Sequence, residues 1–95
     1  MKKAMWIARV NVSDTEAYKL YAAAAKEAIE SFRGKYIVRG GTFKTLEGKE
    51  YERQVVIEFE SLEKAEACYF SEAYQKARKF REGKADFLAC IVECC

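Results

Sequence analysis

The chain has 95 residues, of which 51% are hydrophobic and 34% are charged. This length predicts a single domain over residues 1–95, and such a domain buries roughly 60 to 65% of the surface of its unfolded chain. Lys and Arg number 17 against 15 Asp and Glu, with the two signs interleaved, so the net charge of +2 is not the basic footprint of a nucleic-acid-binding protein. No apolar run approaches the ~20 residues of a membrane span. We therefore expect a cytoplasmic protein that binds neither nucleic acid nor membrane.

Four cysteines are present, and histidine is absent. The cysteines, Cys68, Cys90, Cys94 and Cys95, match no standard zinc spacing, and the commonest partner ligand is missing. Nothing points to secretion, so we expect reduced thiols, no metal site and no cofactor. The lack of histidine also removes the ordinary Cys-His and Ser-His pairs of nucleophilic catalysis.

The first predicted element is a strand over residues 5–12, because polar and apolar residues alternate there. Its apolar face consists of Trp6, Ala8, Val10 and Val12. Its other face carries Ile7, Arg9 and Asn11. The first face suits a core covered by helices, and the second suits a cleft, a partner or solvent.

The first predicted helix follows this strand. Ser13 with Glu16 three residues later is the capping-box signature of a helix start. An apolar stripe then recurs at helical spacing, at Ala17, Leu20, Tyr21, Ala24, Ala28 and Phe32. The helix is expected to end near Arg33, with Gly34 as the left-handed residue that closes it.

A β-hairpin is predicted next. The β-branched run 36–41 carries Arg39 and ends on two glycines, which are typical of a bulge or of close approach to the backbone. Residues 42–46 extend this strand, and Gly48 between two charged residues suggests the turn. The return strand covers residues 51–59.

A second helix and a last strand complete the chain. Ser61 is a plausible N-cap for a helix that continues to Arg81, and Ser71 inside its apolar stripe indicates a division into two shorter helices. Gly83 ends this segment, and residues 86–93 are expected to form a strand. The predicted order is therefore β-α-β-β-α-β.

This order is typical of an α+β ferredoxin-like fold, in which two helices cover one face of a four-stranded antiparallel sheet. The uncovered face is expected to be apolar. It would carry Ile7, Ile37 and Val56, with either Leu88, Cys90 and Val92 or their neighbours. A second subunit is the economical cover, so we expect a homodimer in which two sheets pack face to face as a dimeric α/β barrel.

A resemblance to one family extends along almost the whole chain. The segments that carry it are Trp6-Ile7-Ala8-Arg9-Val10, Val38-Arg39-Gly40-Gly41, Val55-Val56-Ile57-Glu58-Phe59, Tyr69 with residues 71–75, and Ile91-Val92-Glu93. In order and spacing they resemble the small proteins known as domain of unknown function 1330. The resemblance implies a ferredoxin-like dimeric α/β barrel, related in fold to cofactor-free monooxygenases and lactone isomerases, and it implies no established reaction. The chain departs from the family's Trp-Tyr and Asn-Ser-Pro-Glu-Tyr pattern at residues 68–74.

The candidate catalytic pair is Arg39 and Glu58, because a buried or cleft-facing arginine needs an acceptor. If Arg9, Arg39 and Glu58 face away from the helices, they form a polar cluster on the open side of the sheet. Arg39 would hold a carboxylate or enolate there, and Glu58 would be its partner or a general base. The same charges are also typical of an ion pair that holds strand register or a dimer interface, because charge pairs at interfaces are common.

Aromatic residues make up 14% of the chain and are mostly expected in the core. Tyr18, Tyr69 and Tyr74 are the ones whose hydroxyls would reach a cleft, so Tyr69 and Tyr74 join Arg9 and Arg39 as candidate ligand-binding residues. Two functions remain open at this point. One is a binder, or a cofactor-independent enzyme, for a small acidic or enolisable molecule; the other is a non-catalytic dimerisation or interaction module.

Overall fold

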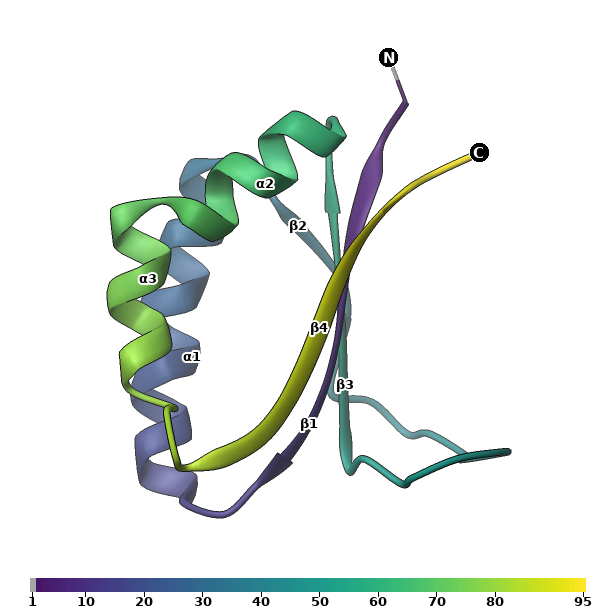
Figure 1. The fold of residues 1–95 in the computed structure, drawn as a ribbon, viewed down its shortest axis with the longest axis vertical. Coiled ribbons are helices and arrows are strands. Elements are labelled where there is room, and N and C mark those ends of the chain that lie inside the picture. The colour runs from purple at the N-terminus through teal and green to yellow at the C-terminus, as the bar shows by residue number, and fades with distance from the viewer. Residues whose placement is uncertain (1) are drawn as a thin grey trace.

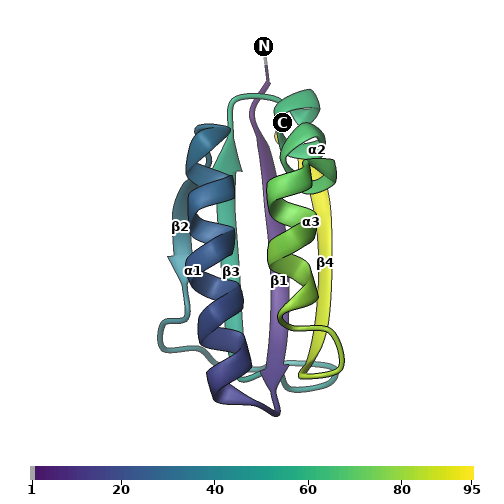
Figure 2. The same cartoon turned by 90° about the vertical axis from the view of Figure 1, so that its left-hand side faces the viewer.

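The computed structural model describes residues 2–95 as one sheet covered by helices on one face (Figure 1). The elements are β1 (Ala4–Val12), α1 (Thr15–Ser31), β2 (Lys35–Arg39), β3 (Arg53–Phe59), α2 (Leu62–Phe70), α3 (Glu72–Lys79) and β4 (Ala85–Glu93). The four strands lie in the order β2-β3-β1-β4, and all neighbours are antiparallel. The predicted α+β class with its four-stranded antiparallel sheet is confirmed, and Figure 2 shows the helices in front of the sheet.

The two faces of the sheet follow from strand alternation. Trp6, Ala8 and Val10 of β1 face the helices and are buried, as the alternation predicted. Ile7 lies on the opposite face, where Val56 and Cys90 are its neighbours on β3 and β4. We call this uncovered side the open face. It carries exposed apolar side chains, including Leu88 and Val92.

A β-bulge in β2 changes the faces on which its last residues lie. Tyr36 pairs with Ile57, whereas the next paired residue, Val38, lies opposite Val56, so Ile37 is an extra residue in the strand. Because one inserted residue exchanges the two faces of a strand beyond it, Val38 lies on the open face and Arg39 faces the helices. The polar cluster considered from the sequence, with Arg39 beside Arg9 and Glu58 on the open face, therefore does not form.

The caps of α1 differ from the prediction by one residue at each end. Asp14, not Ser13, is the N-cap, and its carboxylate accepts the Ala17 N–H at 3.0 Å. Ser13 instead donates its hydroxyl to the Lys84 carbonyl. At the other end Arg33 has the left-handed conformation, with φ of 61°. Gly34 has another role, because a Cβ there would lie 2.5 Å from the Ile29 side chain.

The second helical segment is divided as the sequence predicted. Ser61 caps α2 by accepting the Lys64 N–H. Ser71 ends α2 with an extended backbone and caps α3 through its hydroxyl, which accepts the Tyr74 N–H at 3.2 Å. The break therefore forms without the proline that is common in the family pattern, because a serine supplies the N-cap that a new helix requires.

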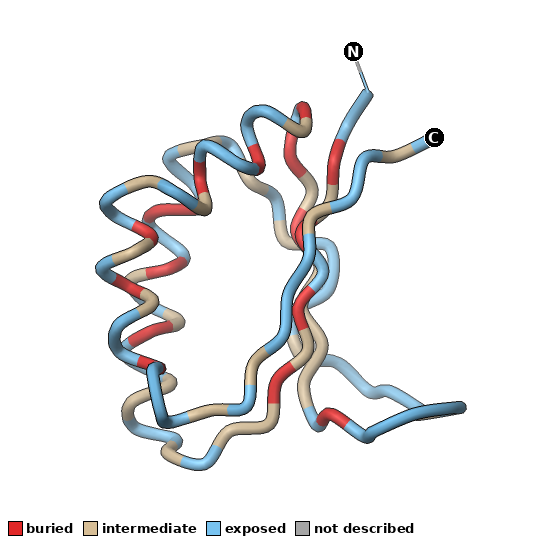
Figure 3. The backbone as a smooth tube through the Cα atoms, in the orientation of Figure 1, coloured by how far each residue is buried: buried red, intermediate tan, exposed pale blue. Residues whose placement is uncertain are grey.

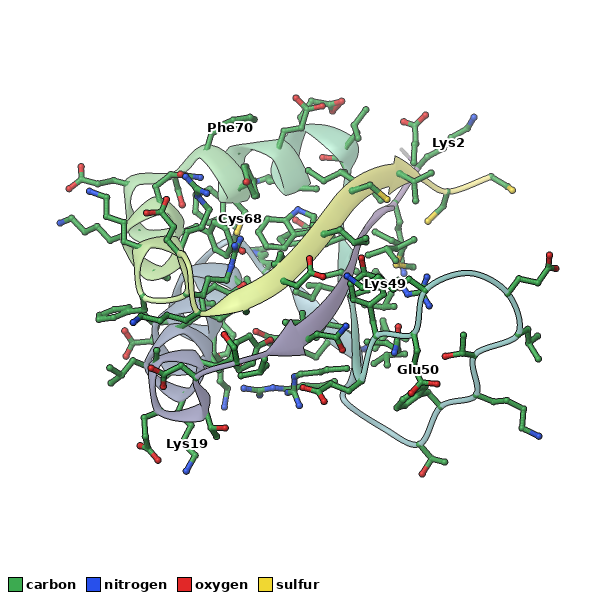
Figure 4. The ribbon with its side chains drawn as sticks, turned by 60° about the horizontal axis from the view of Figure 1, so that its bottom comes forward. Lys2, Lys19, Lys49, Glu50, Cys68 and Phe70 are labelled. Carbon is green, nitrogen blue, oxygen red and sulfur yellow. The ribbon has the colours of Figure 1, made fainter. Side chains whose placement is uncertain are left out.

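Residues 40–52 form a projecting loop, so the predicted extension of β2 over residues 42–46 is wrong. The loop extends from the sheet on the side away from the helices (Figure 1), and Figure 4 shows Lys49 and Glu50 on it. Its base is anchored by Asn11, which donates to the Glu50 carbonyl and accepts the Glu52 N–H. We call residues 41–48 the arm; Leu46 within it is 84% exposed.

The core lies between the sheet and the helices, and Figure 3 shows buried positions alternating along the strands and recurring along the helices. Trp6 is central, because its indole N–H donates to the Ala65 carbonyl at 3.0 Å and its ring contacts Phe59. Figure 4 shows Cys68 on the helical side of the sheet. These contacts attach α2 to the sheet.

Replacing Gly34 with alanine is expected to destabilise the fold by about 1–3 kcal/mol, because the added methyl group overlaps the Ile29 and Phe59 side chains. Gly41→Ala is the matched control, since nothing lies within 4 Å of a Cβ at that position. Chemical denaturation of the two variants measures the difference. Equal free energies of unfolding would contradict this account of the α1 terminus.

Candidate functional site

A cavity of about 480 Å³ lies between the helices and the sheet. Its floor is the helix-facing side of β1, β3 and β4, and its other walls come from α1, α2 and α3. Cavities of this size bind small molecules in many proteins. It is on the opposite side of the sheet from the cleft that the sequence predicted.

Small side chains create this space. In the middle of the sheet Ala8 has Val55 and Ala89 as its cross-strand neighbours, and all three face the helices. Ala22 and Ala25 of α1 line the cavity opposite them. Helices α1 and α3 pack mainly on each other, whereas α2 packs on the sheet. Because the side chains on the sheet and on α1 are both short there, they do not fill the space between the two layers, and a cavity remains.

Aromatic rings form much of the wall. The Trp6 ring lies edge-on to Tyr74 at 4.9 Å and to Tyr69 at 5.8 Å between centroids. Tyr21 lies 5.4 Å from Tyr18 and 5.9 Å from Phe87. These rings come from all three helices and from strands β1 and β4. Such a wall favours a ligand with an apolar or aromatic body.

Two buried tyrosine hydroxyls share a hydrogen bond inside this wall. The Tyr21 and Tyr74 oxygens are 2.7 Å apart, and Tyr74 is 1% exposed. Burial, supported by the neighbouring Tyr74, raises the pKa of Tyr21 well above its ordinary value. Tyr21 is therefore a neutral hydroxyl group at physiological pH. Burial also raises the pKa of Tyr18, and the positive charge of Arg53 opposes that rise.

Arginines dominate the charge of the cavity. Four of them, Arg39, Arg53, Arg78 and Arg81, line it, and Glu66 is the one carboxylate among the described lining residues. Arg78 is neutralised by Glu82 at 3.3 Å. The Nε atoms of Arg53 and Arg81 are buried and have no hydrogen-bond partner within residues 2–95. A buried donor without an acceptor is uncommon in folded proteins.

A family model described as Domain of unknown function (DUF1330) matches residues 3–95. The chain belongs to the DUF1330 family. The resemblance recognised in the sequence is thereby confirmed. A comparison with curated protein sequences found no match.

Solved structures share the fold of this DUF1330 protein at low sequence identity. A protein of unknown function from Rhodopseudomonas palustris is 17% identical with a TM-score of 0.80, over 99% of this chain and 83% of that one. A dimeric ferredoxin-like protein of unknown function from Thermobifida fusca is 14% identical with a TM-score of 0.66, over 98% and 92%. A cofactor-independent oxygenase from Streptomyces nogalater is 6% identical with a TM-score of 0.65, over 100% and 95%. These likenesses show the ferredoxin-like fold.

The predicted pair of Arg39 and Glu58 does not form in the DUF1330 protein. Arg39 faces the cavity, and its guanidinium lies over the Tyr36 ring at 4.6 Å. Glu58 lies on the open face and pairs with Lys3 at 3.2 Å. The bulge at Ile37 is the physical reason, because it moves Arg39 to the other side of the sheet.

Of the four predicted ligand-binding residues, three line the cavity and one does not. Arg39, Tyr69 and Tyr74 are in its wall. Arg9 lies on the open face, where its Nε donates to the side-chain Oε1 of Gln54 at 2.9 Å and its guanidinium lies over the Tyr51 ring. The predicted polar cluster is therefore divided between the two faces of the sheet.

Arg53 and Arg81 line the cavity but were not among the predicted site residues. A signal for Arg53 was present, because it alternates with Val55 and Ile57 and thus shares their helix-facing side. Arg81 ends the predicted second helix, where a basic residue is ordinarily explained by the helix dipole. Its burial, at 8% exposure, depends on β4 returning beneath α3 and is not visible in the local pattern.

None of the helices within residues 2–95 has the length and apolarity required to cross a membrane. In the same range, no three side chains of His, Cys, Asp or Glu come together in a way that would hold a metal ion. The four cysteines are free, and Cys68 alone among them is buried.

Thiol reactivity is expected to separate Cys68 from the other cysteines. Burial raises the pKa of Cys68 to about 12, so the thiolate is scarcely populated at neutral pH. With a thiol reagent at pH 8, we expect Cys94 and Cys95 to react in the folded protein and Cys68 to react only after denaturation. Mass spectrometry of the labelled peptides measures this, and prompt labelling of Cys68 would contradict its burial.

Proposed function

We propose that this DUF1330 protein binds a small acidic or enolisable molecule in the cavity between its sheet and its helices. The observation that carries the proposal is an aromatic-walled space of about 480 Å³ lined by four arginines and one carboxylate. Apolar walls would bury the body of the ligand, and guanidinium groups would hold its negative charge. The proposal keeps the ligand class expected from the sequence and moves the site to the other side of the sheet.

Arg39 is the proposed anchor at one side of the cavity. It is exposed, and its guanidinium is stacked on Tyr36, which restricts its orientation without neutralising it. A planar guanidinium presents paired donors to a carboxylate or enolate. Tyr69 and Tyr74 would contact the body of the ligand, because both rings form part of the wall.

The same arrangement is compatible with catalysis that needs no cofactor. Positive charges fixed before the reaction stabilise an enolate as it forms, and this term is a large one in enzymes. Glu58 lies on the open face, on the other side of the sheet from the cavity, so it cannot act as the base there. We assign that role to Glu66, which lines the cavity. A cofactor-independent oxygenase from Streptomyces nogalater has the same fold, which supports the reading only as an analogy.

We further propose that the protein is a homodimer joined through the open face. Ile7, Leu88 and Val92 are 36%, 44% and 46% exposed there, which leaves an apolar surface that favours burial against a partner. The arm projects from the same side (Figure 1), so it would lie along a second copy. The ferredoxin-like protein from Thermobifida fusca is dimeric, which supports a dimer here. A non-catalytic interaction module would use the same face.

Native mass spectrometry of the protein as purified tests the ligand. We expect a discrete additional mass on the wild type, a strong loss of it with Arg39→Ala, and its absence with Ala22→Leu, because the longer side chain occupies the cavity. Ala23→Leu is the matched control, since Ala23 is exposed on the same helix.

An added mass that persists in Ala22→Leu would contradict the position of the site. An empty wild-type protein that also fails to bind any member of a panel of organic acids would contradict the proposed ligand class and favour the interaction module.

The dimer is tested by placing charge on the open face. Leu88→Glu combined with Val92→Glu is expected to convert the dimer to a monomer in analytical ultracentrifugation, because the carboxylates would have to be buried without partners. Leu20→Glu is the control, as Leu20 is 56% exposed on α1, away from this face. A double variant that remains dimeric would show that the open face is not the interface.

A further inference from the structure

One end of the cavity gathers two arginines and three rings. Across the sheet, Val10 has Arg53 on one side and Phe87 on the other. The guanidinium carbon of Arg81 lies 3.6 Å from the centre of the Phe87 ring and 5.1 Å from that of Tyr21. The guanidinium carbon of Arg53 lies 5.7 Å from the centre of the Tyr18 ring, which contacts Tyr21. We call this region the arginine end.

Both arginines lack a carboxylate partner, and each has one buried donor without an acceptor. Arg81 is only 8% exposed, and its Nε has no hydrogen-bond acceptor in the part of the chain that the structure describes. The Nε of Arg53 is also buried without an acceptor there. No carboxylate of residues 2–95 lies within ion-pair distance of either guanidinium. Charges without partners are strongly disfavoured in a protein interior.

Gly40 leaves room for the guanidinium of Arg53 at this end of the cavity. Gly40 has φ of +71°, and a Cβ there would lie 2.5 Å from a terminal nitrogen of Arg53. A glycine therefore makes room for the guanidinium beside the backbone. This close approach is the role expected of the glycines from the sequence, and it brings an arginine toward the cavity.

The hydroxyl groups beside the arginines add a further donor. In the pair formed by Tyr21 and Tyr74 one hydroxyl hydrogen lies between the two oxygens, so the other hydroxyl has a hydrogen left to donate. Since Tyr21 remains protonated at neutral pH, this donor persists. The groups that lack partners at the arginine end are therefore all donors, and what they require is an oxygen that carries negative charge.

We propose that the ligand is an aromatic or similarly unsaturated anion, and that its carboxylate or enolate oxygens lie between Arg53 and Arg81 with a hydrogen bond from the tyrosine pair. This inference rests on the proposed function and narrows it, because it assigns the charge of the ligand and its orientation. The ring of the ligand extends from the arginine end toward Trp6 and Tyr69. The rest of the wall combines aromatic and apolar side chains with Arg39, Arg78 and Glu66.

Isothermal titration calorimetry with 1-naphthoate and 1-naphthamide tests the assignment, because the two probes share size and ring and differ in charge. We expect the wild type to bind the acid about 10- to 100-fold more tightly, as one or two charge-assisted hydrogen bonds would give. In Arg81→Met and Arg53→Met this preference should fall to less than about threefold. Lys26→Met, which removes an exposed charge from α1, should leave it unchanged.

Thermal unfolding of the ligand-free protein provides a second readout. Arg81→Met keeps an unbranched side chain and removes a buried charge that has no carboxylate partner, so its melting temperature should rise while its affinity for the acid falls. A merely structural Arg81 would give a lower melting temperature. Arg81→Lys keeps the charge without the planar fork and should retain part of the preference.

The outcomes distinguish this inference from the proposed function. Equal binding of both probes by the wild type, or an undiminished preference for the acid in both methionine variants, would overturn the anion assignment and leave a ligand cavity. Binding of neither probe would overturn the assignment and count against the cavity as a site for organic acids.

Discussion

The structure depends on a layer of short side chains in the middle of its core. Ala8 and Ala89 on the sheet face Ala22 and Ala25 on α1, and between them the two layers remain apart. Protein interiors are normally packed as densely as organic crystals, and unfilled volume destabilises the fold. A domain of 95 residues has little core to spare. A cavity of about 480 Å³ in such a domain lowers stability, and this cost is the reason for proposing that a molecule occupies it.

The arginine end of the cavity points to the same explanation on electrostatic grounds. A fold selected for stability alone would replace Arg81 with an apolar side chain, because its charge is withdrawn from water and no carboxylate of the described chain compensates it. Active and binding sites are where proteins retain such groups, since stability is given up there for function. The empty volume and the unpartnered donors lie in one place, and together they make a stronger argument than either alone.

The sheet separates two kinds of surface. Its covered side forms the cavity with its rings and arginines, and its open side presents the apolar side chains proposed to meet a second copy. One inserted residue, Ile37, determines on which side Arg39 lies. The solved structures that share this fold have 17% identity or less, so they support the architecture and not the chemistry. Function must therefore be argued from the side chains that line the cavity.

The sequence by itself determined the order of elements, the helix-facing side of β1, the cap at Ser61 and the division at Ser71, because each depends on local periodicity or on a local hydrogen bond. It also determined the family, because the resemblance extends along almost the whole chain. It did not determine the site. The bulge at Ile37 depends on how β2 pairs with β3, and alternation counted along one strand therefore placed Arg39 on the wrong face. The burial of Arg81 depends on Phe87, which the fold brings beneath it from β4. The cavity exists because short residues from β1, β4 and α1 coincide in space, and only the tertiary structure decides which side chains meet.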